Sequence, residues 1–417
     1  VLEPSWAVPK PGVSDTPEFG MPPNTQNESS VDPTGLDLVT LNRQIVWFAP
    51  KGKQDNDRVA VYREPFQLRT IFGSNTDSKL ISGTIGHKLV PGMLHCTPML
   101  QRGFCRGRQL ALNIVDLDCY MRVFNAAWTP VTSRDHISGL PVTALYDFCN
   151  AFPTLVHEWL FLVLEALQVP SEYFNIIWWL YQMIQAFSSG IGDGGFLFWI
   201  LGGVKTGCPL SSICFVLGIN PIVDLFAYLS DGPKLSVTRI CADDFGSALK
   251  ALKWLKIHAS IFRITKRVSG LCLKGSKCVI IVSCCDLSSE ISELIREWIV
   301  ANVPEFADFK IGNCGKYLGY VLGKSSCELS YQEPLEKFSQ RIDEIVGGRA
   351  PGPMAINRYN ERAVPVLSYV AQFSLPPRTS DFHLKGQHSL HRILRMPPNC
   401  MSVSYTHLRD HETGSYL

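Results

Sequence analysis

Hydrophobic and polar positions alternate in two ways along this chain. Residues 142–148 (VTALYDF) and 196–204 (FLFWILGGV) are apolar runs of strand length, whereas residues 155–169 (LVHEWLFLVLEALQV) have the apolar spacing of a helix. The stretch 174–187 (FNIIWWLYQMIQAF) predicts a buried helix, because it is too short and too often interrupted by polar residues to cross a membrane. This mixture of strands and helices predicts an α+β fold.

Two further short strands follow the central region. Residues 236–242 (SVTRICA) and 245–250 (FGSALK) predict a compact hairpin with two aspartates at its bend. A basic helical stretch comes next, between residues 250 and 267, and on charge alone it is as compatible with a solvated helix face as with a nucleic-acid contact. Beyond it, the pattern is mainly helical to about residue 399.

Shifts in composition divide the chain into five expected parts. The start is rich in Pro, Ser and Asn and predicts a linker or disordered end, while the last residues are expected to be a non-native or disordered tail. A mixed region, a strand-rich region and a helical region lie between them. The expected bounds are 1–35, 36–140, 141–328, 329–400 and 401–417.

Composition limits the class of protein. The chain has 417 residues, 46% of them hydrophobic and 18% charged, which is enough for a large core or several subdomains. The net charge of +2 does not by itself indicate a nucleic-acid binder, although a basic cleft balanced by acidic residues elsewhere has the same total. The 14 cysteines lack metal-finger spacing, and no signal peptide is recognisable. We therefore expect free thiols, a nuclear and cytoplasmic location and no membrane partner.

Three aspartates stand beside apolar strands. Asp147 lies near the end of the strand 142–148, and Asp243 and Asp244 lie at the bend of the hairpin. Burying such carboxylates is costly unless they are paired or bind a metal. An isolated Asp-Asp pair is more often a turn or a helix cap. If the three meet, two bound Mg²⁺ ions and phosphoryl transfer are the chemistry that they predict.

The motifs around these aspartates resemble those of reverse transcriptases of non-LTR (LINE-type) retrotransposons, and they occur in that family's order. The palm motifs are similar to ALYDFCNAFPTLVHEWL, GGVKTGCPLSSICFVLGINPIVD, RICADDFGSAL, SGLCLKGSKCVII and KYLGYVLG. The finger motifs are similar to WFAPKG, REPFQLRTIFGSNTDSKLI and QRGFCRGRQLALNIVDLD, and the start of the thumb to VPVLSYVAQFSLPP and LHRILRMPPN. The resemblance covers roughly residues 47–399.

This resemblance implies a right-hand polymerase: fingers (36–140), palm (141–328) and a partial thumb (329–400), with an antiparallel palm sheet backed by helices. The implied activity is that of an RNA-directed DNA polymerase, a nucleotidyltransferase acting in retrotransposition. Its implied partners are an RNA template, a DNA primer and deoxynucleoside triphosphates. An endonuclease domain would be encoded elsewhere in the full-length protein.

The resemblance also assigns roles at the reaction centre. Asp147 and Asp243 would hold two Mg²⁺ ions, for which Mn²⁺ can substitute, with help from the main-chain carbonyl of Phe148, and Asp244 would complete the aspartate pair. Lys277 would protonate the leaving pyrophosphate, although Lys274 is close enough in the sequence to exchange roles with it.

Further residues would bind the nucleotide. Phe152 stands where the family has an aromatic steric gate against a ribose 2′-hydroxyl, although its spacing alone also fits a core aromatic. Thr206 and Gly207 would lie beside the incoming nucleotide, where a glycine lets the backbone approach closely and a helix-start turn is the alternative. Four finger cations would bind the triphosphate, with exposed basic residues as the alternative: Arg69, Lys79, Lys51 and Arg63.

A last group would contact primer and template. Gln101 and Arg102 belong to a finger motif, and Tyr317 and Gly319 resemble the primer grip, where a structural β-turn is the alternative. Thr206 replaces a Gln that many relatives have.

Two other functions stay open at this point. One is a catalytically silent RNA-binding remnant, against which the three intact aspartates argue. The other is a viral RNA-dependent RNA polymerase, which Phe152 and Ala242 disfavour because such enzymes usually have a second aspartate at the first position and GDD at the second.

Overall fold

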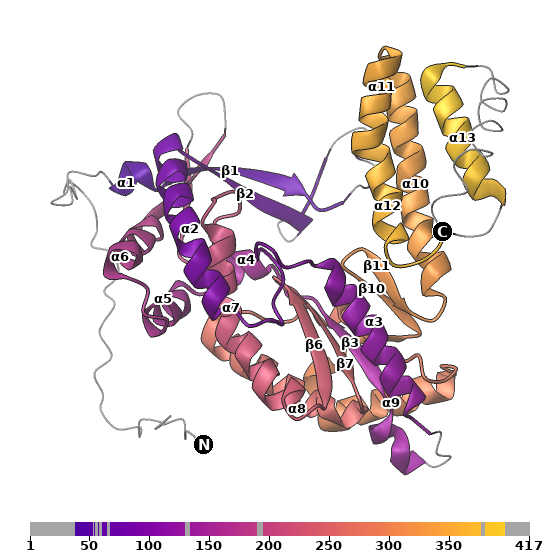
Figure 1. The fold of residues 1–417 in the computed structure, drawn as a ribbon. Helices are drawn as coiled ribbons and strands as arrows, with labels where there is room; N and C mark the ends of the chain where they lie inside the picture. Colours follow the sequence, from indigo (N-terminus) through magenta and orange to yellow (C-terminus); the bar gives the residue numbers. More distant parts are fainter. Residues whose placement is uncertain are drawn as a thin grey trace, which may run out of the picture.

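The computed structural model describes residues 38–52, 54, 57, 61–64, 67–129, 134–189, 195–376 and 380–396. It combines helices with one mainly antiparallel sheet and one mixed sheet, so the predicted α+β class is confirmed (Figure 1). The predicted linker 1–35 and tail 401–417 lie outside the described residues.

A five-stranded sheet forms the centre of the molecule. Its strand order is β6-β7-β3-β8-β9, and every neighbouring pair is antiparallel except β8 with β9, so the sheet is mainly antiparallel, as expected. The strands are β3 (Val142–Tyr146), β6 (Ser236–Cys241), β7 (Asp244–Leu249), β8 (Val279–Ile281) and β9 (Lys310–Gly312).

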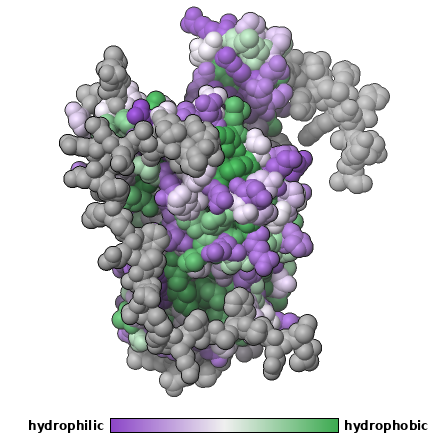
Figure 2. Space-filling model, turned by 90° about the vertical axis from the view of Figure 1, so that its left-hand side faces the viewer, coloured by the Kyte–Doolittle hydropathy of each residue, from purple (hydrophilic) through white to green (hydrophobic). Residues whose placement is uncertain are grey.

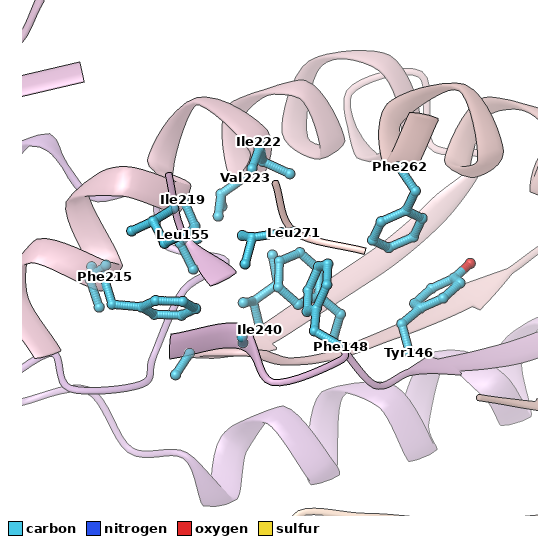
Figure 3. Packing of buried hydrophobic residues seen from close by; sticks show 14 of the residues in the cluster. Tyr146, Phe148, Leu155, Phe215, Ile219, Ile222, Val223, Ile240, Phe262 and Leu271 are labelled. Atoms are coloured by element: carbon cyan, nitrogen blue, oxygen red, sulfur yellow. The ribbon is translucent and has the colours of Figure 1, made fainter. Parts of the chain in front are cut away.

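Both faces of this sheet are covered, which explains why β3 is buried along its whole length. One face packs against α7 (Ser211–Phe226), α8 (Leu255–Ser269) and α9 (Ser289–Asn302) in the largest hydrophobic cluster (Figure 3). The other face packs against α3 (Ala111–Ala126) and a hairpin of two strands, β10 (Cys314–Tyr317) and β11 (Tyr320–Gly323).

A second sheet, in the order β2-β1-β4-β5, lies beside this body. Its strands are β1 (Arg43–Pro50), β2 (Leu68–Ser74), β4 (Ile184–Ser188) and β5 (Phe196–Ile200). The surrounding helices are α1 (Leu38–Leu41), α2 (Thr76–Cys96), α4 (Ala151–Thr154), α5 (His157–Ala166) and α6 (Ser171–Leu180).

The single helix predicted over residues 174–187 is wrong in its second half. Helix α6 ends at Leu180, and β4 begins at Ile184. Met183 adopts a positive φ of 48°, which a helix cannot accommodate, and the chain then pairs in parallel with β1. A long-range strand pairing therefore overrides the local apolar pattern.

The C-terminal part is helical, as predicted. Helix α10 (Ser326–Gly347) packs with α11 (Gly352–Arg358), α12 (Val364–Ala371) and α13 (Ser380–Leu394) around a separate small core. In Figure 1 these helices stand apart from the central sheet, next to the β10–β11 hairpin. The naming of these parts as fingers, palm and thumb stays a prediction.

One described helical segment, Ser211–Asp231, is long and apolar enough to cross a membrane by length and composition. Most of it is buried inside the protein, where α7 forms part of the main core, and this is also what a core helix of a soluble protein shows. On the side of the molecule in Figure 2, apolar patches lie between polar residues at the surface. Every cysteine that the structure describes is a free thiol, as predicted.

Candidate active site

The strand register brings the three aspartates together. Tyr146 pairs with Phe245 at the end of the β3–β7 ladder, so Asp147 leaves β3 where Asp244 begins β7. Tyr146 and Phe148 both point into the main core (Figure 3). Because neighbouring residues of an extended chain point to opposite sides, the side chain of Asp147 points away from this core.

The two hairpin aspartates are presented by a two-residue turn. Cys241 pairs with Asp244, which leaves Ala242 and Asp243 as the loop. Ala242 has a φ of 57°, whereas Asp243 has no positive φ, as in a type II′ turn, where glycine is favoured at the first position. An alanine there costs roughly 1 kcal/mol of backbone strain or more. The surrounding structure must therefore hold this turn.

The three aspartates repel one another electrostatically. Burial raises the pKa of Asp243 above its ordinary value, and the charge of Asp147 raises it further. Burial, followed by the charges of Asp243 and Asp147, raises the pKa of Asp244 to about 6, although this side chain stays open to solvent. The nearby charge of Lys277 opposes both shifts. Carboxylates in this arrangement are stabilised in their charged form by bound cations.

The predicted metal ligands form an oxygen-only set. Two carboxylates, Asp147 and Asp243, would be joined by the carbonyl of Phe148, a donor set that suits Mg²⁺. Antiparallel bonds to the neighbouring segment are made on either side of Phe148, from Lys274 N to the Asp147 carbonyl and from Cys149 N to the Cys272 carbonyl, both 2.8 Å. The Phe148 carbonyl therefore points away from that segment. Within the described residues, no group of three or more His, Cys, Asp or Glu side chains is arranged to hold a metal ion.

The main chain of Asp147 is fixed by a residue that the sequence did not indicate. The Sγ atom of Cys278 accepts a hydrogen bond from Asp147 N at 3.3 Å, and this thiol is fully buried. Burial raises the pKa of Cys278 to about 11, so it acts here as a neutral thiol. A cysteine directly before the apolar strand β8 carries no pattern that would have revealed this contact.

The sequence left Lys277 and Lys274 as alternatives for the group that protonates the leaving pyrophosphate. The structure brings Lys277 to the aspartates. Its Nζ lies 3.5 Å from Asp147 Oδ2, at the end of the short 3₁₀ turn Gly275–Lys277. The side chains are 56% and 37% exposed, so this is an open ion pair and not a buried one that would exclude metal ions. Lys274 contributes its main chain to the carbonyl of Asp147.

Further cations gather next to this pair. Lys51 donates a hydrogen bond from Nζ to Asn150 Oδ1 at 2.8 Å. Its pKa is lowered by burial and then by the charges of Lys274, Lys277 and Arg69. Arg69 is on β2, opposite Ala49 of β1, with an exposed side chain. The second sheet and the segment after β1 thus bring positive charge next to Lys277.

Two other predicted cations are not part of this group. Lys79 is exposed in the first turn of α2 and is not among the charges that shift the pKa of Lys51. Arg63 forms two hydrogen bonds of 2.7 Å with the carboxylate of Asp57. Their assignment to the triphosphate stays a prediction.

Phe152 is held firmly near Asp147. Its ring stacks on Phe215 with centroids 4.4 Å apart and an angle of 9°, and it meets Phe104 edge-on at 6.0 Å. Its carbonyl accepts a hydrogen bond from Val204 N at 2.8 Å. The half-buried ring therefore has one fixed orientation, as a steric gate requires.

Thr206 and Gly207 contact β2 directly. The hydroxyl of Thr206 donates to the carbonyl of Thr70 at 2.5 Å, and Thr206 O accepts from Phe72 N at 3.1 Å. Gly207 has a φ of 101°, and a Cβ there would lie 2.8 Å from the Phe72 carbonyl. Only glycine fits this close approach, which supplies a structural reason for it beside the predicted nucleotide contact.

The predicted primer and template residues make contacts within the protein. Gln101 is fully buried, and Arg102 pairs with Asp116 at 2.8 Å. The hydroxyl of Tyr317 lies 3.0 Å from the Arg239 carbonyl and 3.3 Å from the Asp244 carbonyl.

Gly319 lies in a tight turn at the tip of the β10–β11 hairpin. With φ of 83° it follows Leu318 at 47°, the two positive values of a type I′ turn. The Tyr369 hydroxyl donates to the Leu318 carbonyl at 2.5 Å, which ties this turn to α12.

Asn113 is a second residue that the sequence did not single out. Its Nδ2 donates to the Ile240 carbonyl at 3.0 Å and reaches the Tyr317 hydroxyl at 3.4 Å, and its Oδ1 accepts from Arg102 at 2.9 Å. A fully buried amide joins the two hairpins in this way. Its position among the apolar residues of α3 is the only pattern that could have indicated it.

The raised pKa of Asp244 leads to a stability prediction. The folded state binds this proton more tightly than the unfolded state, so stability falls as the pH rises from about 4 to above 6. In metal-free protein, Asp244→Asn should raise the free energy of unfolding by about 1 kcal/mol at pH 7.5, after allowance for solvent screening. Urea unfolding in EDTA measures this.

At pH 4.5 the difference should be less than half as large, and it should vanish below the unfolded pKa of 3.8. Asp286→Asn is the control of opposite sign, because Lys324 lowers the pKa of Asp286. A gain in stability that did not depend on pH would contradict the proposed cause.

Comparison with known proteins finds similarity to solved structures. Apo telomerase from Candida tropicalis matches with 11% identity over 90% of this chain and 68% of that one, with a TM-score of 0.49. Telomerase from Candida tropicalis in complex with a TWJ fragment of telomeric RNA matches over 90% of this chain and 62% of that one, with 10% identity and a TM-score of 0.47. The corresponding complex from Candida albicans matches over the same shares, with 11% identity and a TM-score of 0.44. An apo form from Candida tropicalis truncated of its C-terminal domain matches over 68% of this chain and 53% of its own, at 11% identity and a TM-score of 0.42. No protein-family model and no curated protein matches the sequence. The chain thus spans between about half and two thirds of these telomerases.

Proposed function

We propose that this chain is the core of a reverse transcriptase, an RNA-directed DNA polymerase that adds deoxynucleotides to a primer 3′ end on an RNA template. The observation that carries the proposal is the β3–β7 register, which brings Asp147 beside the hairpin turn that presents Asp243 and Asp244. The retrotransposon setting rests on the non-LTR motifs of the sequence, and the nuclear and cytoplasmic location rests on the free thiols and on a sequence in which no signal peptide is recognisable.

The proposed chemistry uses the aspartates on one side of the site and the cations at the second sheet on the other. When bound, two Mg²⁺ ions would activate the attacking hydroxyl and stabilise the leaving pyrophosphate in phosphoryl transfer. Asp147, Asp243 and the Phe148 carbonyl would hold the metal ions. The repulsion between the two carboxylates supports this role, because bound cations would relieve it. The positive charges of Arg69 and Lys51 support binding of the triphosphate from the side of the second sheet.

Lys277 is the proposed proton donor. Its ammonium group is 3.5 Å from Asp147, which would orient it beside the reacting phosphates. A positioned general acid of this kind contributes typically about 10²–10⁴-fold to a rate. Phe152 would exclude ribonucleotides through its fixed ring.

Primer extension tests the proposal. With an RNA template, a DNA primer and Mg²⁺, we expect template-dependent incorporation of deoxynucleotides and little incorporation of ribonucleotides, with activity also in Mn²⁺. Template binding that weakens steeply with salt, without extension in either metal, would instead identify a silent RNA-binding remnant. Preferential use of ribonucleotides would identify an RNA-dependent RNA polymerase.

A further inference from the structure

An additional extended segment runs along β6 and ends at the aspartate turn. Arg102 N donates to the Ile240 carbonyl at 2.8 Å, and Ile240 N donates to the Leu100 carbonyl at 2.9 Å, so residues 100–102 pair in parallel with the end of β6. This segment comes from the region before the central sheet, more than 130 residues away in sequence. It meets the turn at Ala242, whose φ is positive.

The carboxamide of Gln101 contacts both main-chain polar groups of Ala242, its N–H and its carbonyl. Its Oε1 accepts from Ala242 N at 2.9 Å and from Gly103 N at 2.7 Å, and its Nε2 lies 3.4 Å from the Ala242 carbonyl. The side chain is 0% exposed. Ala242 is the residue with positive φ that directly precedes Asp243.

Two neighbouring residues, Gly103 and Arg108, keep Gln101 in contact with Ala242. A Cβ on Gly103 would lie 2.2 Å from Ala242 N, so only glycine lets the two chains come this close. The guanidinium of Arg108 donates to four main-chain carbonyls, those of Leu94, Thr97, Pro98 and Gln101, at 2.6–3.2 Å. Arg108 therefore fixes the segment that presents the carboxamide.

We infer that Gln101 is a positioning residue, which holds Ala242 in its left-handed conformation and thereby sets the direction of the Asp243 carboxylate. This replaces the contact with primer or template that its motif implied. The inference rests on the proposed function, because Asp243 is there a metal ligand. Gln101 would thus act through Ala242 and Asp243 without touching the substrate.

Two substitutions remove the contact in different ways. Gln101→Met keeps the volume but loses all three hydrogen bonds, and Gln101→Asn keeps the amide but is one methylene too short to reach Ala242. Each should lower kcat of primer extension about 10- to 100-fold, as loss of outer-shell partners does at metal sites, while KM for the deoxynucleotide changes less than about twofold. Asn42→Leu is the matched control, since Asn42 is also fully buried and donates to two carbonyls, of Trp179 and Gln182. It should lower Tm and leave kcat unchanged.

Rescue separates positioning from packing. Glycine adopts positive φ without strain, so Ala242→Gly in the Gln101→Met protein should restore kcat by at least about threefold. Mn²⁺ titration followed by electron paramagnetic resonance gives a second readout that needs no turnover, with the Asp243→Asn protein as background. Gln101→Met should weaken Mn²⁺ binding by about fivefold or more, and Asn42→Leu should not.

The outcomes are distinct for the two proposals. Wild-type protein that binds Mn²⁺ but extends no primer would overturn the proposed function, and the Mn²⁺ affinity of the Gln101 variants would still decide the inference. Wild-type kcat and Mn²⁺ affinity in folded Gln101→Met and Gln101→Asn proteins, or no rescue by Ala242→Gly, would overturn the inference alone.

Discussion

Asp243→Asn is expected to lower the rate of primer extension by at least about 10²–10³-fold, the loss typical of removing one group that stabilises transition-state charge. The amide keeps the size of the carboxylate but removes one of the two negative charges proposed to hold the metal ions. The pKa of Asp243 is already raised by burial and by Asp147, so the substitution also relieves repulsion. Lost activity with equal or higher stability is therefore the expected combination.

Single-turnover extension and thermal unfolding measure the two parts of this result. Asp286→Asn is the control, since Asp286 is an exposed aspartate that pairs with Lys324 at the surface, and its rate should be unchanged. Primer extension by Asp243→Asn at the wild-type rate would remove the metal-ion mechanism. Equal loss in the control would point to a general effect of charge.

Phe152→Val should admit ribonucleotides, with the ratio of kcat/KM for deoxynucleotide over ribonucleotide falling by about 10²-fold, the scale on which a pocket discriminates by shape. The ring is held between Phe215 and Phe104, so it cannot turn aside for a 2′-hydroxyl. Valine removes the part of the ring that would meet this hydroxyl. Deoxynucleotide addition itself should fall much less.

The comparison uses matched deoxy- and ribonucleoside triphosphates on one template. Phe174→Val on α6 makes the same chemical change at another half-buried aromatic, which contacts Phe161, and should leave the ratio unchanged. A wild-type ratio in Phe152→Val would show that Phe152 is only a core aromatic. The alternative interpretation of its spacing would then hold.

Much of the fold could be predicted because its signals are local. The apolar runs of β3 and β5 and the β6–β7 hairpin were predicted at their observed places, as was the helical C-terminal part. The failure at α6 and β4 has a physical cause, since β4 exists through its pairing with β1, about 140 residues away in sequence. Local periodicity does not contain such a pairing.

By itself, the sequence indicated the candidate residues for the proposed chemistry: acidic side chains after apolar strands, the aromatic Phe152, and either Lys277 or Lys274. Only the tertiary structure decided how they meet. The register of β3 with β7 joins the aspartates, and the fold brings Lys51 and Arg69 into the neighbourhood of Lys277. It also decided that Gln101 faces inward to Ala242, because a hydrogen bond depends on distance and direction in space, and residues far apart in the chain acquire both only when it folds.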